Sequence, residues 1–196
     1  MPTVLTMTHA SGKATNYAGG KAALRRAIAE RRRAQSQTAR EETAQALCSR
    51  VLALPAVQAA GTVAVYASYP SEPGTWPLRT ALLDRGVRVL LPVLLADGDL
   101  NWVVDADQPT SLGPDSITAA DVVVCPASAA TPEGARLGKG GGSYDRALAR
   151  LPASTLSIAL VYDDEIVEHL PTEQHDKTVG VIVSPRRTLY SGHWPG

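Results

Sequence analysis

A cluster of glycines marks the segment Glu133–Arg146, whose sequence is EGARLGKGGGSYDR. The clustered residues are Gly138, Gly140, Gly141 and Gly142. Without Cβ atoms, such a backbone lets a ligand approach closely. Backbone N–H groups in a glycine-rich turn that opens a helix bind anions, above all phosphate. Because Arg136, Lys139 and Arg146 flank the glycines, we favour a phosphate cradle over a flexible surface loop.

Two familiar phosphate-binding motifs are absent from this segment. A P-loop has four residues between its glycines and then Lys followed by Ser or Thr, whereas Gly134 and Gly138 are separated by three and Lys139 is followed by Gly140. A dinucleotide-binding fingerprint that began at Gly138 would need glycine at the position of Ser143. The segment therefore predicts a cradle of a different kind.

The elements that position this segment alternate between strand and helix. Apolar runs predict strands, and segments with helical spacing predict helices. The expected strands are 62–69, 87–91, 101–104, 121–126, 155–161 and 179–183, and the expected helices after Pro55 are 76–85 and 143–151. This order predicts an α/β fold: three layers, with a mostly parallel twisted sheet and helices on both faces. Ligands of such folds bind at the carboxyl ends of the strands.

A basic N-terminal helix is expected before the sheet, over 21–54, with a possible break at 36–38. Residues 21–50 contain eight basic and three acidic side chains, whereas the remainder of the chain is acidic, so the net charge is zero. The length of 196 residues suits a single α/β domain over 21–196, preceded by a flexible tail over 1–20.

Composition narrows the class of protein. Two cysteines are too few for a disulfide framework, and their spacing is not that of a zinc site. No apolar run reaches the roughly 20 residues of a membrane span, and the N-terminus does not look like a signal peptide. We expect a cytoplasmic protein, monomeric, with small-molecule substrates and neither nucleic acid nor membrane as partner.

The stretch RLGKGGGSYDR resembles the hallmark of the 5-formyltetrahydrofolate cyclo-ligase family, Arg-Leu-Gly-x-Gly-x-Gly-Tyr-Tyr-Asp, which corresponds here to Arg136–Asp145. Three weaker anchors follow the family's order. They are the opening KAALR at 21–25, the strand and loop VYASYPSE at 65–72, and the closing segment LPTEQHDKTV at 170–179. The resemblance covers most of 21–184.

The resemblance implies an ATP-dependent ring closure with Mg²⁺. The family converts 5-formyltetrahydrofolate to 5,10-methenyltetrahydrofolate while ATP becomes ADP and phosphate. A formamide oxygen is a poor leaving group, so transfer of the γ-phosphoryl group to that oxygen makes an imidate phosphate. The second folate nitrogen then attacks the activated carbon, and phosphate departs. The enzyme contributes mainly positioning and charge stabilisation.

The resemblance also implies roles for individual residues. Lys139 and Arg25 are the expected catalytic residues, because both would neutralise phosphate charge. The expected nucleotide-binding residues are Lys21, Arg25, Arg136, Leu137, Gly138, Lys139, Gly140, Gly141, Gly142, Ser143 and Tyr144. The expected substrate-binding residues are Ala67, Glu72, Trp102, Lys139, Gly140, Gly141, Gly142 and Ser143. Asp145 and Asp176 match the magnesium ligands.

Taken without the family, several of these residues have plainer explanations. Lys21 and Arg25 share one helical face, and their plainer explanation is that both are solvated surface charges. Asp145 suits a helix start, and Asp176 and Glu72 suit exposed loops. The resemblance implies an apolar residue against the folate at Trp102, and because aromatic residues make up only 5% of the chain, we favour a pocket wall over core there.

Ser143 departs from the hallmark, which has tyrosine at that position. The loss of this ring removes one expected folate contact, while the serine hydroxyl suits a helix N-cap. A diverged motif keeps open a non-catalytic nucleotide-binding protein or a phosphosugar-type enzyme. A nucleic-acid-binding module that uses the basic helix is a further alternative, against which the acidic remainder and the missing aromatic pattern count.

Overall fold

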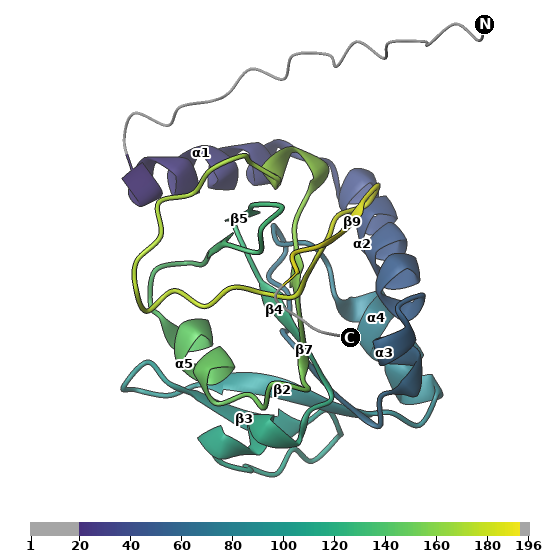
Figure 1. Ribbon diagram of the computed structural model, residues 1–196. Helices are drawn as coiled ribbons and strands as arrows, with labels where there is room; N and C mark the ends of the chain where they lie inside the picture. The colour runs from purple at the N-terminus through teal and green to yellow at the C-terminus, as the bar shows by residue number, and fades with distance from the viewer. Residues whose placement is uncertain (1–19, 193–196) are drawn as a thin grey trace, which may run out of the picture.

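The computed structural model describes residues 20–192, so the expected tail lies outside the described residues apart from Gly20, which begins the first helix. Within this range the main sheet has seven strands in the order β3-β2-β1-β4-β7-β8-β9 (Figure 1). These strands are β1 (Thr62–Val65), β2 (Arg88–Leu94), β3 (Leu100–Val104), β4 (Val122–Pro126), β7 (Leu156–Leu160), β8 (Val181–Val183) and β9 (Thr188–Tyr190). The five central strands run parallel, and the edge strands β3 and β9 are antiparallel to their neighbours.

Helices cover both faces of the sheet, which confirms the three-layer α/β prediction. The helices are α1 (Gly20–Ala34), α2 (Gln37–Leu52), α3 (Pro55–Ala59), α4 (Trp76–Asp84) and α5 (Ser143–Ala149), with 3₁₀ turns η1 (Pro114–Ala119) and η2 (Asp163–Glu165). Apolar residues of α2, α3 and α4 share one core cluster with the sheet. Residues of α5 and η1 share the other with its opposite face. Because both faces are covered, the central strands are apolar almost throughout.

The basic N-terminal segment forms two helices, with the break at the expected place. Ser36 has an extended backbone, and its hydroxyl accepts the N–H of Ala39 at 3.1 Å, so it is the N-cap of α2. Leu24 and Ile28 bury the inner face of α1 against a small hairpin of β5 (Ala129–Ala130) and β6 (Arg136–Leu137). This hairpin lies within the long connection that precedes the glycines, where no strand was expected.

A buried ion pair also attaches α1. The Arg32 guanidinium donates to Glu165 through Nε at 2.7 Å and Nη2 at 2.8 Å, and also to the Ala127 carbonyl at 2.6 Å. Burial lowers the pKa of Arg32, but the hydrogen bond and charge of Glu165 outweigh that effect and raise it, so Arg32 stays charged. α1 therefore lies across the carboxyl ends of β4 and β7 (Figure 1).

Some predicted boundaries were wrong. The strand expected over 62–69 ends at Val65, and the chain then forms a loop that leads into α4. In that loop the Thr75 hydroxyl donates to the Tyr66 carbonyl at 2.7 Å, and the Ser68 hydroxyl accepts the Thr75 N–H at 3.1 Å. These bonds replace ladder pairing. Over the described part of the chain, every helix is too short or too polar to cross a bilayer.

Candidate active site

A cavity of about 910 Å³ opens where β1 and β4 end, which is the edge at which parallel sheets bind ligands. Segments far apart in the sequence line it: α1, the loop after β1, the β2–β3 hairpin, the glycine-rich loop and the segment 173–176. The predicted site residues on its wall are Lys21, Arg25, Ala67, Glu72, Arg136, Leu137, Gly138, Lys139, Gly140, Gly141, Gly142, Ser143, Tyr144, Asp145 and Asp176. The cavity therefore gathers all predicted site residues except Trp102.

The glycine-rich loop needs glycine at two positions for its shape. Gly140 and Gly142 have φ angles of 108° and 68°, a region that side-chain-bearing residues rarely adopt. Gly142, not Ser143, is the N-cap of α5, so the expected capping role of Ser143 was wrong. The Ser143 hydroxyl instead donates to the Gly98 carbonyl at 2.6 Å, which ties the start of α5 to the β2–β3 hairpin.

Arg25, on α1, contacts the glycine-rich loop directly. Its Nε donates to the Gly138 carbonyl at 2.7 Å. A Cβ atom on Gly140 would lie 3.5 Å from the Arg25 Cζ, so the guanidinium packs directly against the glycine backbone. Arg25 and the glycine-rich loop, more than a hundred residues apart in sequence, thus form one cationic surface. Such a surface suits an anion.

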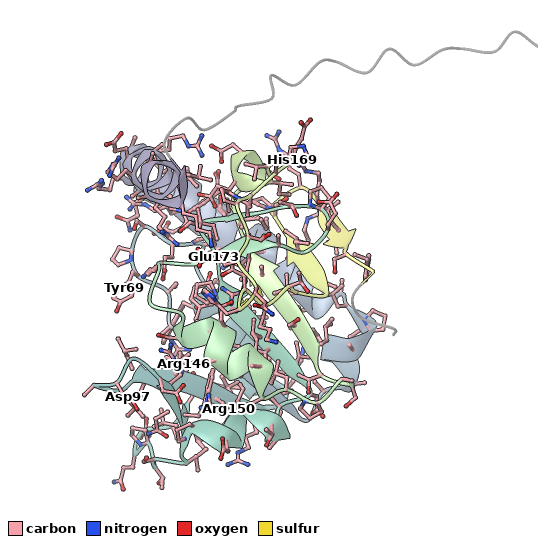
Figure 2. The ribbon with its side chains drawn as sticks, turned by 60° about the vertical axis from the view of Figure 1, so that its left-hand side comes forward. Tyr69, Asp97, Arg146, Arg150, His169 and Glu173 are labelled. Carbon is pink, nitrogen blue, oxygen red and sulfur yellow. The ribbon has the colours of Figure 1, made fainter. Side chains whose placement is uncertain are left out.

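Lys139 reaches across the cavity to the loop that follows β1. Its Nζ lies 2.8 Å from Glu72 Oε1 and 4.0 Å from the centre of the Tyr69 ring. Glu72 is 6% exposed, and its other carboxylate oxygen accepts the Tyr69 N–H at 2.8 Å. Figure 2 shows Tyr69 at the edge of the molecule, between α1 and the hairpin that carries Asp97.

Asp145 and Asp176 also face the cavity, and each is paired with a cation. Asp145 Oδ1 accepts Arg136 Nη2 at 2.8 Å and the Lys177 N–H at 2.9 Å. Asp176 Oδ2 accepts Lys21 Nζ at 2.8 Å. The hydrogen bond that Lys21 donates to Asp176 raises the pKa of Lys21, although burial opposes it. For Asp176, burial is outweighed by the bond from Lys21, which lowers its pKa.

The two aspartates fit a magnesium ion by donor chemistry. Mg²⁺ is usually held by one or two carboxylates together with water and substrate phosphates. Among residues 20–192, Asp145 Oδ2 accepts no hydrogen bond, and Asp176 Oδ1 has only His175 Nε2 at 3.8 Å. No cluster of three or more His, Cys, Asp or Glu side chains forms a metal cage in that range. A site completed by phosphate oxygens is therefore the kind that these residues fit.

Trp102 does not line the cavity, which corrects the expectation of a pocket wall. Its side chain is 0% exposed and packs in the core with Leu90 and Ile117. Its ladder partner Pro92 and its same-face neighbour Leu100 both line the cavity, but the Trp102 ring itself is enclosed by core residues. In a chain without phenylalanine, the largest aromatic ring fills the core.

Several lining residues were missed. Tyr69, Leu94 and Leu100 contribute an aromatic and two aliphatic side chains, and Arg32 adds a cation from α1. Tyr69 and Leu94 are 65% and 66% exposed. Two sequence signals could have indicated Tyr69: aromatic residues are scarce in this chain, and Tyr69 comes three residues before Glu72. Nothing in the local pattern indicated that the hairpin would fold beside the glycine-rich loop.

Fold and cavity together define an α/β protein with a glycine-rich, cation-lined cavity that also contains a buried carboxylate. The model of the 5-formyltetrahydrofolate cyclo-ligase family matches residues 18–185. The 5-formyltetrahydrofolate cyclo-ligase of Mycolicibacterium smegmatis (strain ATCC 700084 / mc(2)155) is 36% identical over 187 residues, covering 86% of this chain and 95% of the relative. That of Escherichia coli (strain K12) is 32% identical over 177 residues, covering 82% and 97%. This chain belongs to the 5-formyltetrahydrofolate cyclo-ligase family.

Solved structures support the fold. The 5,10-methenyltetrahydrofolate synthetase of Aquifex aeolicus has a TM-score of 0.74 at 23% identity, covering 88% of this chain and 93% of that one. The synthetase of Mycoplasma pneumoniae has a TM-score of 0.73 at 22% identity, covering 85% and 99%. The fold of this chain is thus that of a known architecture.

Proposed function

We propose that this cyclo-ligase family member closes the ring of 5-formyltetrahydrofolate to give 5,10-methenyltetrahydrofolate, with conversion of ATP to ADP and phosphate. The single observation that carries the proposal is the shared cavity: the glycine-rich loop with its cations faces Glu72 across one space. A nucleotide triphosphate and a reduced pterin can therefore meet there. The volume of about 910 Å³ lies at the upper end of the roughly 300–1,000 Å³ usual for ligand pockets, as two substrates require.

The phosphate side of the site consists of the glycine backbone, Arg25, Lys21 and Lys139. Arg25 already bonds the Gly138 carbonyl through Nε, which leaves its two terminal nitrogens for phosphate oxygens. Glycines flank Lys139 on both sides, so its side chain can move with the γ-phosphoryl group as negative charge develops on that group. These residues stabilise the transfer and do not form a covalent bond with the phosphoryl group.

The folate side consists of Glu72 and the loop that follows β1. The carboxylate is buried and accepts the Tyr69 N–H, so its remaining oxygen can accept N–H donors from the amino-bearing pterin ring. Leu94 and Leu100 offer aliphatic surface for the flat ring system. With the formyl oxygen towards Lys139 and the glycines, phosphorylation and ring closure take place in one cavity.

Mg²⁺ belongs to this proposal as the ion that neutralises phosphate charge when bound. Asp145 and Asp176 would hold it, each through the oxygen left without a short hydrogen bond among the described residues. We also propose a cytoplasmic monomer. The two cysteines, both buried and unpaired, suit a reducing compartment.

The decisive experiment mixes the protein with 5-formyltetrahydrofolate, ATP and Mg²⁺ and follows the near-ultraviolet absorbance of the methenyl product. Lys139→Met and Asp145→Asn should each lower kcat/KM by at least about a hundredfold, because the first removes a cation that stabilises phosphate charge and the second removes a proposed magnesium ligand. Arg88→Met, which changes an exposed cation at the opposite end of the sheet, should leave it unchanged.

Circular dichroism must show that the variants remain folded. A wild-type protein that binds ATP but gives no methenyl band would refute the proposed reaction and favour the non-catalytic nucleotide-binding alternative. Near-normal turnover of both Lys139→Met and Asp145→Asn would refute the site assignment. The nucleic-acid alternative loses its main support, because Lys21, Arg25 and Arg32 of the basic helix face the cavity.

A further inference from the structure

The ion pair between Lys139 and Glu72 joins the two halves of the cavity. Lys139 belongs to the phosphate half and Glu72 to the folate half, yet Nζ and Oε1 lie 2.8 Å apart. The lysine side chain is 60% exposed, whereas the glutamate is 6% exposed. The pair therefore links a mobile, solvated cation to a buried anion that needs a partner.

Lys139 and Glu72 cannot keep their ion pair and at the same time bind their proposed substrates fully. A pterin ring that donates N–H groups to Glu72 takes the place of Lys139, and a triphosphate that attracts Lys139 leaves the buried carboxylate without its cation. Glycines on both sides of Lys139 make its displacement easy, because Gly138 and Gly140 carry no side chains that would lock the loop.

We propose that the Lys139–Glu72 ion pair couples the two substrate sites, so that each substrate releases the residue that the other one needs. The inference rests on the proposed function, which assigns phosphate to Lys139 and the pterin to Glu72. Binding of either substrate first breaks the ion pair at a cost, and the second binds without that cost. The resulting cooperativity is equal in both directions by thermodynamic linkage.

Tyr69 keeps the released lysine in place. Its ring centre lies 4.0 Å from Lys139 Nζ, and this cation–π contact does not involve the Glu72 carboxylate. A neutral ring holds the cation without cancelling its charge, so Lys139 remains near the cavity and available to phosphate. Tyr69 acts as a positioning residue for Lys139.

The first test is nucleotide binding without folate, measured by calorimetric titration with the non-hydrolysable ATP analogue AMP-PNP and Mg²⁺. Glu72→Gln should bind AMP-PNP about fivefold more tightly than the wild type, because Lys139 is free from the start. In the wild type, saturating 5-formyltetrahydrofolate should produce the same gain, and in Glu72→Gln it should produce none. An unchanged or weaker AMP-PNP affinity in Glu72→Gln overturns the proposal.

A double-mutant cycle separates the ion pair from a general effect of removing negative charge. In a Lys139→Met background, Glu72→Gln should no longer tighten AMP-PNP binding. If the tightening persists there, it comes from the overall field and the coupling is refuted. Raised salt should reduce the wild-type coupling, since the exposed lysine is screened.

The reciprocal arm uses Lys139→Met with 5-formyltetrahydrofolate alone. Without its competitor, Glu72 should bind the folate about fivefold more tightly, and an unchanged affinity contradicts the coupling. This arm decides the matter if Glu72→Gln does not fold. Both arms measure binding, so they are independent of turnover: a wild type that shows the coupling but no methenyl band would refute the proposed reaction alone.

Discussion

At the scale of residues, the cavity is electrically almost balanced before any substrate enters. Lys21 is paired with Asp176, Arg136 with Asp145, and Lys139 with Glu72. Among the described arginines and lysines that line the cavity, Arg25 is the exception, because its hydrogen-bond partner is a carbonyl and not a carboxylate. An entering triphosphate therefore competes with carboxylates for most of these cations, whereas it finds the charge of Arg25 uncompensated.

Arg25→Lys tests that distinction. The substitution keeps the charge but removes the planar guanidinium that holds the Gly138 carbonyl and presents further donors. ADP affinity, measured by calorimetry with Mg²⁺, should fall about tenfold. Arg26→Lys, at the exposed neighbouring position, should leave it unchanged. Equal ADP affinities for the wild type and Arg25→Lys would show that charge alone suffices there.

At the scale of elements, α1 acts as a cover whose attachment depends on one buried ion pair. Leu24 and Ile28 bury its apolar face, and Arg32 fixes its last turn to Glu165. The same helix carries Lys21 and Arg25 at its other end, so the attachment of the last turn also positions the phosphate-facing cations.

Arg32→Met should destabilise the protein by about 3–5 kcal/mol, because it leaves the buried Glu165 carboxylate without its cation. The free energy of unfolding in urea measures this effect. Arg31→Met is the matched control: its exposed pair with Asp164, at 3.4 Å, should contribute less than about 1 kcal/mol. A similar loss in both variants would contradict the special role of Arg32.

The β2–β3 hairpin is a second element held by charge. Asp99, at its turn, accepts both terminal nitrogens of Arg150 from the end of α5, while Ser143 and Arg146 donate to the Gly98 carbonyl. These bonds hold the hairpin, with Leu94 and Leu100, against the start of α5. The serine that departs from the family hallmark thus has a structural role in this clamp.

The clamp predicts a pH dependence. The hydrogen bond from Arg150 holds the pKa of Asp99 below its ordinary value of 3.8. A carboxyl whose pKa is lower in the folded state stabilises the protein above about pH 4, and this contribution is lost as the pH falls through the folded pKa. Asp99→Asn should therefore cost about 1–2 kcal/mol at pH 7 and progressively less below pH 4.

Urea unfolding of the wild type and Asp99→Asn at pH 7 and pH 3 measures this difference. Asp115→Asn serves as the control, because Asp115 contacts the same Arg150 at 3.2 Å but its side chain is 91% exposed. Its effect should be within about 0.5 kcal/mol at both pH values. A constant difference between wild type and Asp99→Asn across this pH range would contradict the assigned pKa.

At the scale of the whole molecule, the site exists because the topology brings distant segments to one edge of the sheet. Because β1, β4 and β7 run parallel, all three end at that edge, and α1 lies across it. Lys21 and Asp176 are 155 residues apart in sequence, yet they bond at 2.8 Å. No single segment contains the chemistry of both proposed substrates.

Much of this was predictable from the sequence. Apolar runs between glycines and prolines indicated buried strands, and their alternation with helices indicated the layered α/β fold, because period and composition reflect local burial. The glycine-rich loop indicated phosphate, since absence of side chains is itself a local property. The strand expected over 62–69 ends at Val65, because hydrogen bonds with Thr75 replace ladder pairing beyond it. These bonds depend on the path of the loop that brings Thr75 back beside Tyr66 and Ser68.

What the amino-acid order by itself determined was the class of fold, the family, and the glycine-rich segment to which we assign phosphate binding. Only the tertiary structure decided that Trp102 fills the core, that Ser143 bonds the Gly98 carbonyl, and that Lys139 rests on Glu72. The physical reason is the distance along the sequence over which each kind of interaction acts. Propensity and periodicity act over a few neighbouring residues, whereas the partner of a charge or a ring is chosen by strand register and by loops that meet only when the sheet has formed.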